Sequence, residues 1–95
     1  MYHIAIVEDE RTFSEQLQEF LKEYQEEKNI NFKISVFKDG AEILEEYKQI
    51  YDIILLDIEM PEINGMETAR RIRKTDAEVV LMFFTWHPTQ YTGMR

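Results

Sequence analysis

The chain has 95 residues, a formal net charge of −8, 44% hydrophobic residues and no cysteine. A chain of this length forms one hydrophobic core, which rules out two domains. Its excess of acidic residues is unfavourable for contact with a phosphate backbone, so no direct nucleic-acid binding is expected. The missing cysteines exclude disulfides and thiolate metal sites, and no apolar run reaches the ~18 residues of a membrane span, so we expect a cytoplasmic protein without membrane contact.

The chain opens with a predicted strand over residues 2–7. Its last four residues are all apolar, which is typical of a parallel strand covered by helices on both faces. The strand ends in two carboxylates, Glu8 and Asp9. Thr12, which precedes a glutamate by three residues, has the spacing of a capping box and predicts a helix over residues 12–27.

The next predicted elements are a second strand and a second, shorter helix. Residues 32–36 alternate apolar and polar side chains, as expected for a half-buried strand near a sheet edge. Three apolar residues at helical spacing mark the helix that follows: Leu44, Tyr47 and Ile50. The sequence thus alternates strand and helix twice.

A second continuous apolar run, residues 53–56, also stops on a carboxylate, Asp57. Asn64 is placed to cap a third helix. Three apolar residues are expected to form its buried stripe: Met66, Ala69 and Ile72. Residues 79–84 then form the last apolar strand, which ends at Thr85.

This alternation of four strands with three helices predicts an α/β fold, with a parallel sheet covered by helices on both faces. Ligands of such sheets bind outside the carboxyl ends of the strands. Four polar side chains follow the three most apolar strands: Glu8, Asp9, Asp57 and Thr85. We therefore expect these side chains to converge at the end of the sheet where the strands have their carboxyl ends.

Three convergent carboxylates repel one another, and a divalent cation would relieve that repulsion. Ligands that are all oxygen, with room for water, favour Mg²⁺. Mg²⁺ in such a cluster is also what phosphoryl transfer requires, with Asp57 as nucleophile and the Thr85 hydroxyl donating to a phosphoryl oxygen. Two plainer interpretations stay open: residues 8–10 as a solvated entrance to a helix, and Asp57 as a turn residue.

Four motifs occur along the chain in a fixed order: Glu8-Asp9, residues 53–61, Asn64-Gly65 and residues 80–85. In this order they resemble the receiver domains of two-component response regulators, and the resemblance covers residues 2–85. It implies a doubly wound, flavodoxin-like fold with strand order 2-1-3-4. Residues 59–67 look like the branch whose full-length members carry a LytTR-type DNA-binding domain.

The resemblance implies a role for each matched residue. Asp57 would accept a phosphoryl group from a phosphohistidine on a sensor histidine kinase. Asp9 would bind Mg²⁺ directly, Glu8 would bind it directly or through water, and the backbone carbonyl of Glu59 would be a further ligand. Thr85 would be the switch hydroxyl. A receiver domain is a phosphoacceptor rather than an enzyme, limited to slow self-phosphorylation from small donors and self-dephosphorylation, and the longer parent would regulate transcription.

The chain also departs from the family pattern. Family members have a fifth strand ending in a Lys that pairs with the phosphoryl group, and then a last helix. Residues 1–95 stop before that Lys, so we expect one incomplete receiver domain without the last strand and helix. Thr85 is followed by Trp86 where a small residue is usual, and Tyr91 matches an aromatic of the next helix. Without a fifth strand, residues 79–84 would form a bare edge, which predicts self-association.

Two further function classes remain. One is a receiver remnant that pairs with other subunits without being phosphorylated, a role favoured by the absent Lys and the bulky Trp86. The other is a haloacid-dehalogenase-type phosphatase, because Glu59 lies two positions after Asp57, where that class has its second Asp. That class places the motif on its opening strand, so the preceding strand with Glu8 and Asp9 argues against it.

Overall fold

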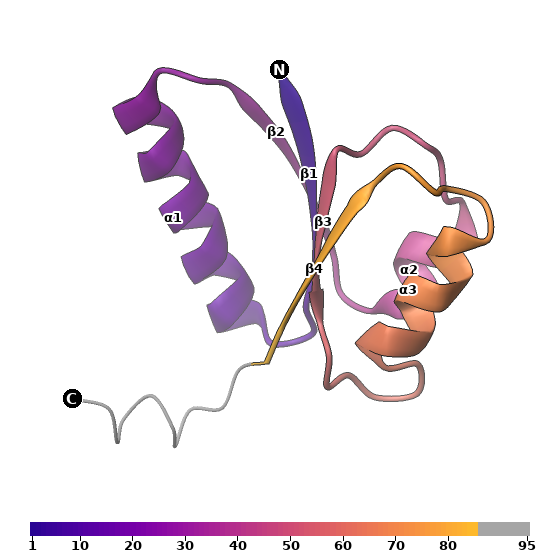
Figure 1. Cartoon of the computed structure of the whole chain (residues 1–95). Helices are drawn as coiled ribbons and strands as arrows, with labels where there is room; N and C mark the ends of the chain where they lie inside the picture. The colour runs from indigo at the N-terminus through magenta and orange to yellow at the C-terminus, as the bar shows by residue number, and fades with distance from the viewer. Residues whose placement is uncertain (86–95) are drawn as a thin grey trace.

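The computed structural model describes residues 1–85 and shows a parallel sheet of four strands with three helices (Figure 1). The elements are, in order, β1 (Tyr2–Val7), α1 (Arg11–Lys28), β2 (Phe32–Phe37), α2 (Gly40–Glu45), β3 (Ile53–Asp57), α3 (Gly65–Arg73) and β4 (Val80–Phe84). The strands lie in the order β2-β1-β3-β4, all parallel to their neighbours. The predicted α/β class and strand order 2-1-3-4 are therefore confirmed.

The sheet separates two layers of helices, with α1 on one face and α2 and α3 on the other (Figure 1). The larger core lies on the α2 and α3 side, where alternate residues of the central strands meet these helices. Its fully buried members include Val7, Ile43, Ile54, Leu56 and Ile72. Burying each such side chain contributes roughly 1.5–3 kcal/mol, so the continuous apolar runs of β1 and β3 hold the sheet at its centre.

Helix α1 begins at Arg11, one residue earlier than the capping box predicted, and Thr12 is not its cap. The carboxylate of Glu10 accepts the backbone N–H of Thr12 over 2.9 Å and caps the helix instead. Glu15 does not complete a box, because it pairs with Arg11 at 3.1 Å on the exposed surface. None of the helices in the described part of the chain combines the length and apolar character needed to cross a membrane.

Helix α2 is shorter than its apolar spacing suggested, and it ends at Glu45. Tyr47 lies beyond it and packs against the core from the following loop, where its hydroxyl donates to Asp76 over 2.7 Å. Ile50 is half exposed. The prediction that Tyr47 and Ile50 belong to the helix was wrong, because a hydrogen bond to a residue 29 positions away holds Tyr47 in place of helical packing.

Helix α3 is capped by Asn64 as expected, whose side chain accepts the N–H of Glu67 over 2.9 Å. Ala69 and Ile72 are buried as predicted, whereas the prediction was wrong for Met66, which is 50% exposed. The buried residues are Gly65, Thr68, Ala69 and Ile72. These positions have the i, i+3, i+4, i+7 spacing of a single helix face, and Met66 falls outside it.

Strand β4 lies at the edge of the described sheet and pairs only with β3 there. It begins at Val80, and none of its five residues is charged. Val80, Met82 and Phe83 each expose two fifths or more of their surface. Among residues 1–85, β4 therefore presents the most apolar edge of the sheet.

Candidate metal centre

Three carboxylates meet at the carboxyl end of the two central strands. One oxygen each from Glu8, Asp9 and Asp57 lies within 4.8 Å of the others. β1 and β3 are adjacent, and Val7 is in register with Leu56, so the residues that follow them emerge side by side. The expected convergence of these three carboxylates is observed.

Glu8 is almost fully buried, at 3% exposure. Its Oε2 accepts the N–H of Glu10 over 2.7 Å, whereas its Oε1 is buried and finds no hydrogen-bond donor among the described residues. Burial raises the pKa of Glu8 to about 8, and the neighbouring charge of Asp57 acts in the same direction. The alternative interpretation of residues 8–10 as a solvated entrance to a helix fits Glu10, which is exposed. It does not fit Glu8, which is buried.

Asp57 is buried at the end of β3, with 4% exposure. Its Oδ1 accepts the backbone N–H of Glu59 over 3.1 Å, which fixes the orientation of the carboxylate. Burial raises the pKa of Asp57, and the charge of Asp9 raises it further, although the N–H of Glu59 opposes this. Asp57 therefore closes a short turn and also faces the other carboxylates.

The three carboxylates fit a small divalent cation. Two oxygens on opposite sides of Mg²⁺ are about 4 Å apart, so a small inward movement would bring these side chains to bonding distance. A cation would also provide a partner for Glu8 Oε1, which has no hydrogen-bond donor in the described part of the chain. Asp9 is exposed and leaves one side of the cluster open to water, as Mg²⁺ requires.

Thr85 follows β4, at the same carboxyl end of the strands as the three carboxylates, and it is exposed. Phe84 is in register with Asp57, and its carbonyl accepts the N–H of Ile58 over 2.8 Å. The backbone just before Thr85 is thus attached to the loop that follows Asp57. Trp86 and Tyr91, which were singled out in the sequence, lie outside the described residues.

A hollow of about 300 Å³ adjoins the cluster between β1, α1 and the end of β2. Glu8 and Asp9 line it together with Ser14, Gln18 and Lys38. Lys38 follows β2 just as Glu8 follows β1, and it was not among the candidate residues expected from the sequence. The rule that ligands bind at the carboxyl ends of strands would have identified it.

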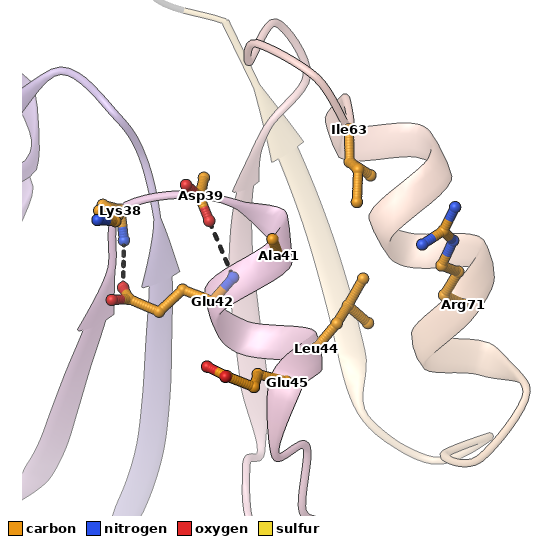
Figure 2. Close-up of a pocket in the computed structure, with 8 residues that line it drawn as sticks. All are labelled: Lys38, Asp39, Ala41, Glu42, Leu44, Glu45, Ile63 and Arg71. Carbon is orange, nitrogen blue, oxygen red and sulfur yellow. Dashed lines mark hydrogen bonds between the residues drawn. The ribbon is translucent and has the colours of Figure 1, made fainter.

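A separate hollow of about 570 Å³ lies between α2 and α3 (Figure 2). Leu44 and Ile63 reach into it from the two sides, and Arg71 of α3 lies at its rim (Figure 2). The Glu42 carboxylate turns away from α3 and accepts the N–H of Lys38 over 2.8 Å. None of the three convergent carboxylates lines this hollow, so it is distinct from the candidate metal centre.

The amino-acid sequence is similar to those of known response regulators. The family model of the response regulator receiver domain matches residues 4–94. The uncharacterized transcriptional regulatory protein YkoG of Bacillus subtilis is 33% identical over 97% of the chain. The sensory transduction protein LytT of Oceanobacillus iheyensis is 38% identical over 87% of the chain. The chain spans 40% of the length of the first and 33% of the second.

Solved structures give the same result. The response regulator TrrA of Thermotoga maritima, crystallised in complex with Mg²⁺ and BeF, is 32% identical, with a TM-score of 0.78 over 97% of this chain and 76% of that one. TrrA bound to the histidine kinase ThkA matches with 34% identity and a TM-score of 0.75, over 93% of this chain and 73% of that one. The fold, the family match and these relatives agree, and the chain belongs to the response regulator receiver domain family.

Proposed function

We propose that the chain accepts a phosphoryl group on Asp57 from a sensor histidine kinase, with Mg²⁺ held by Glu8, Asp9, Asp57 and the backbone carbonyl of Glu59. The observation that carries this proposal is the group of three convergent carboxylates, one of which has a buried oxygen with no hydrogen-bond partner among residues 1–85. The TrrA structures with Mg²⁺ and BeF and with the kinase ThkA support it by similarity.

In this proposal the residues of the chain orient the reaction. The N–H of Glu59 holds Oδ1 of Asp57, and we assign Oδ2 as the nucleophile. The new Oδ2–P bond forms as the P–N bond of the phosphohistidine breaks, and that electron pair stays on the imidazole nitrogen. Bound Mg²⁺ supplies positive charge that neutralises the phosphoryl oxygens. The Thr85 hydroxyl donates a hydrogen bond to one of them.

Incubation with acetyl phosphate and Mg²⁺, followed by intact mass measurement, tests this function. We expect one phosphoryl group per chain, no uptake in EDTA, and no repeated turnover of a small phosphomonoester. A chain that takes up no phosphoryl group with Mg²⁺ present is instead an interaction module that works without phosphorylation. Rapid turnover of the phosphomonoester would identify a phosphatase.

We further propose that residues 1–95 act as one cytoplasmic receiver unit of a parent that regulates transcription. The relatives YkoG and LytT, named as a transcriptional regulator and a sensory transduction protein, support this assignment. The net charge of −8 makes direct binding of this unit to the phosphate backbone of DNA unfavourable. The similarity to LytT agrees with a parent of the LytTR-type branch.

We also propose that the chain self-associates through β4. Edge strands of natural proteins are usually protected by charged side chains or Pro, and β4 has neither. Met82 is 52% exposed on this edge strand. Edge-to-edge pairing would satisfy backbone groups and bury this apolar surface, and the acidic surface opposes it only through screened repulsion.

Met82→Lys is accordingly expected to turn a self-associating chain into a monomer at micromolar concentration, because a charged edge disfavours pairing. Sedimentation velocity across a concentration series measures the change. Phe20→Lys is the matched control, since Phe20 on α1 is 64% exposed and lies on no strand edge. A wild-type chain that is monomeric throughout, or two variants that behave alike, contradicts pairing through β4.

A further inference from the structure

Gly65, the first residue of α3, approaches the backbone of the candidate metal centre very closely. A Cβ atom at this position would lie 2.3 Å from the carbonyl oxygen of Asp57, and 2.9 Å from the Asp57 carbonyl carbon and the Ile58 Cα. All three are backbone atoms, so no side-chain rotation relieves the overlap. A methyl group would push α3 and the end of β3 roughly 1 Å further apart to reach normal contact distance.

This close contact belongs to a short chain of backbone hydrogen bonds that passes through the site. The N–H of Gly65 donates to the carbonyl of Ile58 over 2.9 Å, and the N–H of Ile58 donates to the carbonyl of Phe84 over 2.8 Å. The next N–H, that of Glu59, holds the carboxylate of Asp57 at 3.1 Å. The start of the loop is therefore held between β4 and α3.

Gly65 is required here for space and not for its backbone conformation. No glycine among the described residues has a positive φ. Alanine fits helical geometry well and even favours it, so an Ala at this position would carry no conformational penalty of its own. Any loss on substitution by Ala therefore comes from the contact with Asp57 and Ile58.

We propose that Gly65 is a positioning residue for the phosphoacceptor site. Because it has no side chain, α3 can seat the backbone of residues 57–59 where the Asp57 carboxylate and the Glu59 carbonyl meet the cation. Gly65 itself touches neither the cation nor the phosphoryl group. The inference rests on the proposed function, because its readout is Mg²⁺ affinity.

The chain provides a matched control in Gly40, the first residue of α2. A Cβ atom there would also overlap α3, at 2.1 Å from Oγ1 of Thr68, so Gly40→Ala likewise disturbs the packing of this helix. The overlapped atoms belong to a side chain, however, and not to the backbone of Asp57. The two glycines thus separate helix packing from site positioning.

The experiment compares the wild-type chain, Gly65→Ala and Gly40→Ala by urea unfolding without metal and by Mg²⁺ titration followed through backbone amide NMR signals. We expect Gly65→Ala to weaken Mg²⁺ affinity by about 10- to 100-fold, as loss of support around metal ligands typically does. Gly40→Ala should lower stability and leave the affinity unchanged. Equal affinity changes in both variants, or none in Gly65→Ala, would overturn the proposal.

A measurement on the wild-type chain decides the matter if Gly65→Ala does not fold. Added Mg²⁺ should shift the amide signal of Gly65 together with that of Glu59, and should leave the signal of Gly40 in place. A Gly65 signal that stays in place while that of Glu59 shifts contradicts the coupling. A wild-type chain in which Mg²⁺ shifts no signal contradicts the proposed function, which is a different result.

Discussion

Asp57→Asn is expected to abolish phosphoryl uptake from acetyl phosphate, because an amide oxygen is too weak a nucleophile to replace the carboxylate. The substitution also removes one of the three carboxylates proposed to bind Mg²⁺, so Mg²⁺ affinity should fall in the same variant. Asparagine keeps the size of the side chain and its acceptor for the N–H of Glu59, so the turn is retained. Intact mass measurement with Mg²⁺ present gives the result directly.

Asp52→Asn is the matched control for this prediction. Asp52 precedes β3, at the opposite end from Asp57, and its exposed carboxylate accepts the N–H of His3 over 2.8 Å. The same chemical change there should leave phosphoryl uptake at the wild-type level. Uptake by Asp57→Asn, or equal loss in both variants, would remove Asp57 as the acceptor.

The second large effect concerns the pH dependence of stability without metal. Glu8 has a pKa of about 8 in the folded chain and an ordinary value of 4.5. Between these values the unfolded chain binds fewer protons than the folded chain, so the free energy of unfolding falls as pH rises. We expect the melting temperature in EDTA to be higher at pH 5.5 than at pH 8, by about 5 °C or more.

Mg²⁺ should reverse this trend. The cation competes with the proton for Glu8 and for Asp57, whose pKa burial also raises, so it binds more tightly as pH rises. Thermal unfolding followed by circular dichroism, with Mg²⁺ or EDTA across this range, measures both trends. The lowered pKa values of Glu67 and Asp76 affect stability only in more acidic solution.

Glu8→Gln is expected to remove most of the decline in EDTA, because it removes the buried carboxyl that must lose its proton. Glu78→Gln, at an exposed position, should leave the decline as it is in the wild-type chain. A slope that persists unchanged in Glu8→Gln would show that another group controls the pH dependence.

The sequence predicted the parts of the fold that depend on local pattern. Uninterrupted apolar runs mark strands buried on both faces, so β1 and β3 were placed correctly, and with them Glu8 and Asp57 at their ends. The predictions were wrong where contacts between residues distant in the sequence determine the structure. The partner of Tyr47 is Asp76, and no local spacing reveals such a contact. Likewise, Thr68 is buried because α2 approaches it through Gly40.

The candidate site shows the same division. The carboxylates that follow the apolar strands could be predicted to form the site, because neighbouring parallel strands have their carboxyl ends on the same side of the sheet. Two features depend on the assembled backbone and could not be predicted. One is the Glu8 oxygen left without a donor, which requires knowledge of every neighbouring group. The other is the space that Gly65 leaves beside Asp57.

The turn between β1 and α1 has a consequence for how the chain could report the state of its site. Glu10 connects Glu8 to the start of α1: its N–H donates to Glu8 Oε2, and its carboxylate accepts the N–H of Thr12. A change of charge on Glu8 therefore reaches the first turn of a helix of 18 residues through a single intervening residue. The hydrogen-exchange rates of the first amides of α1 are therefore expected to change when an ion binds at the site.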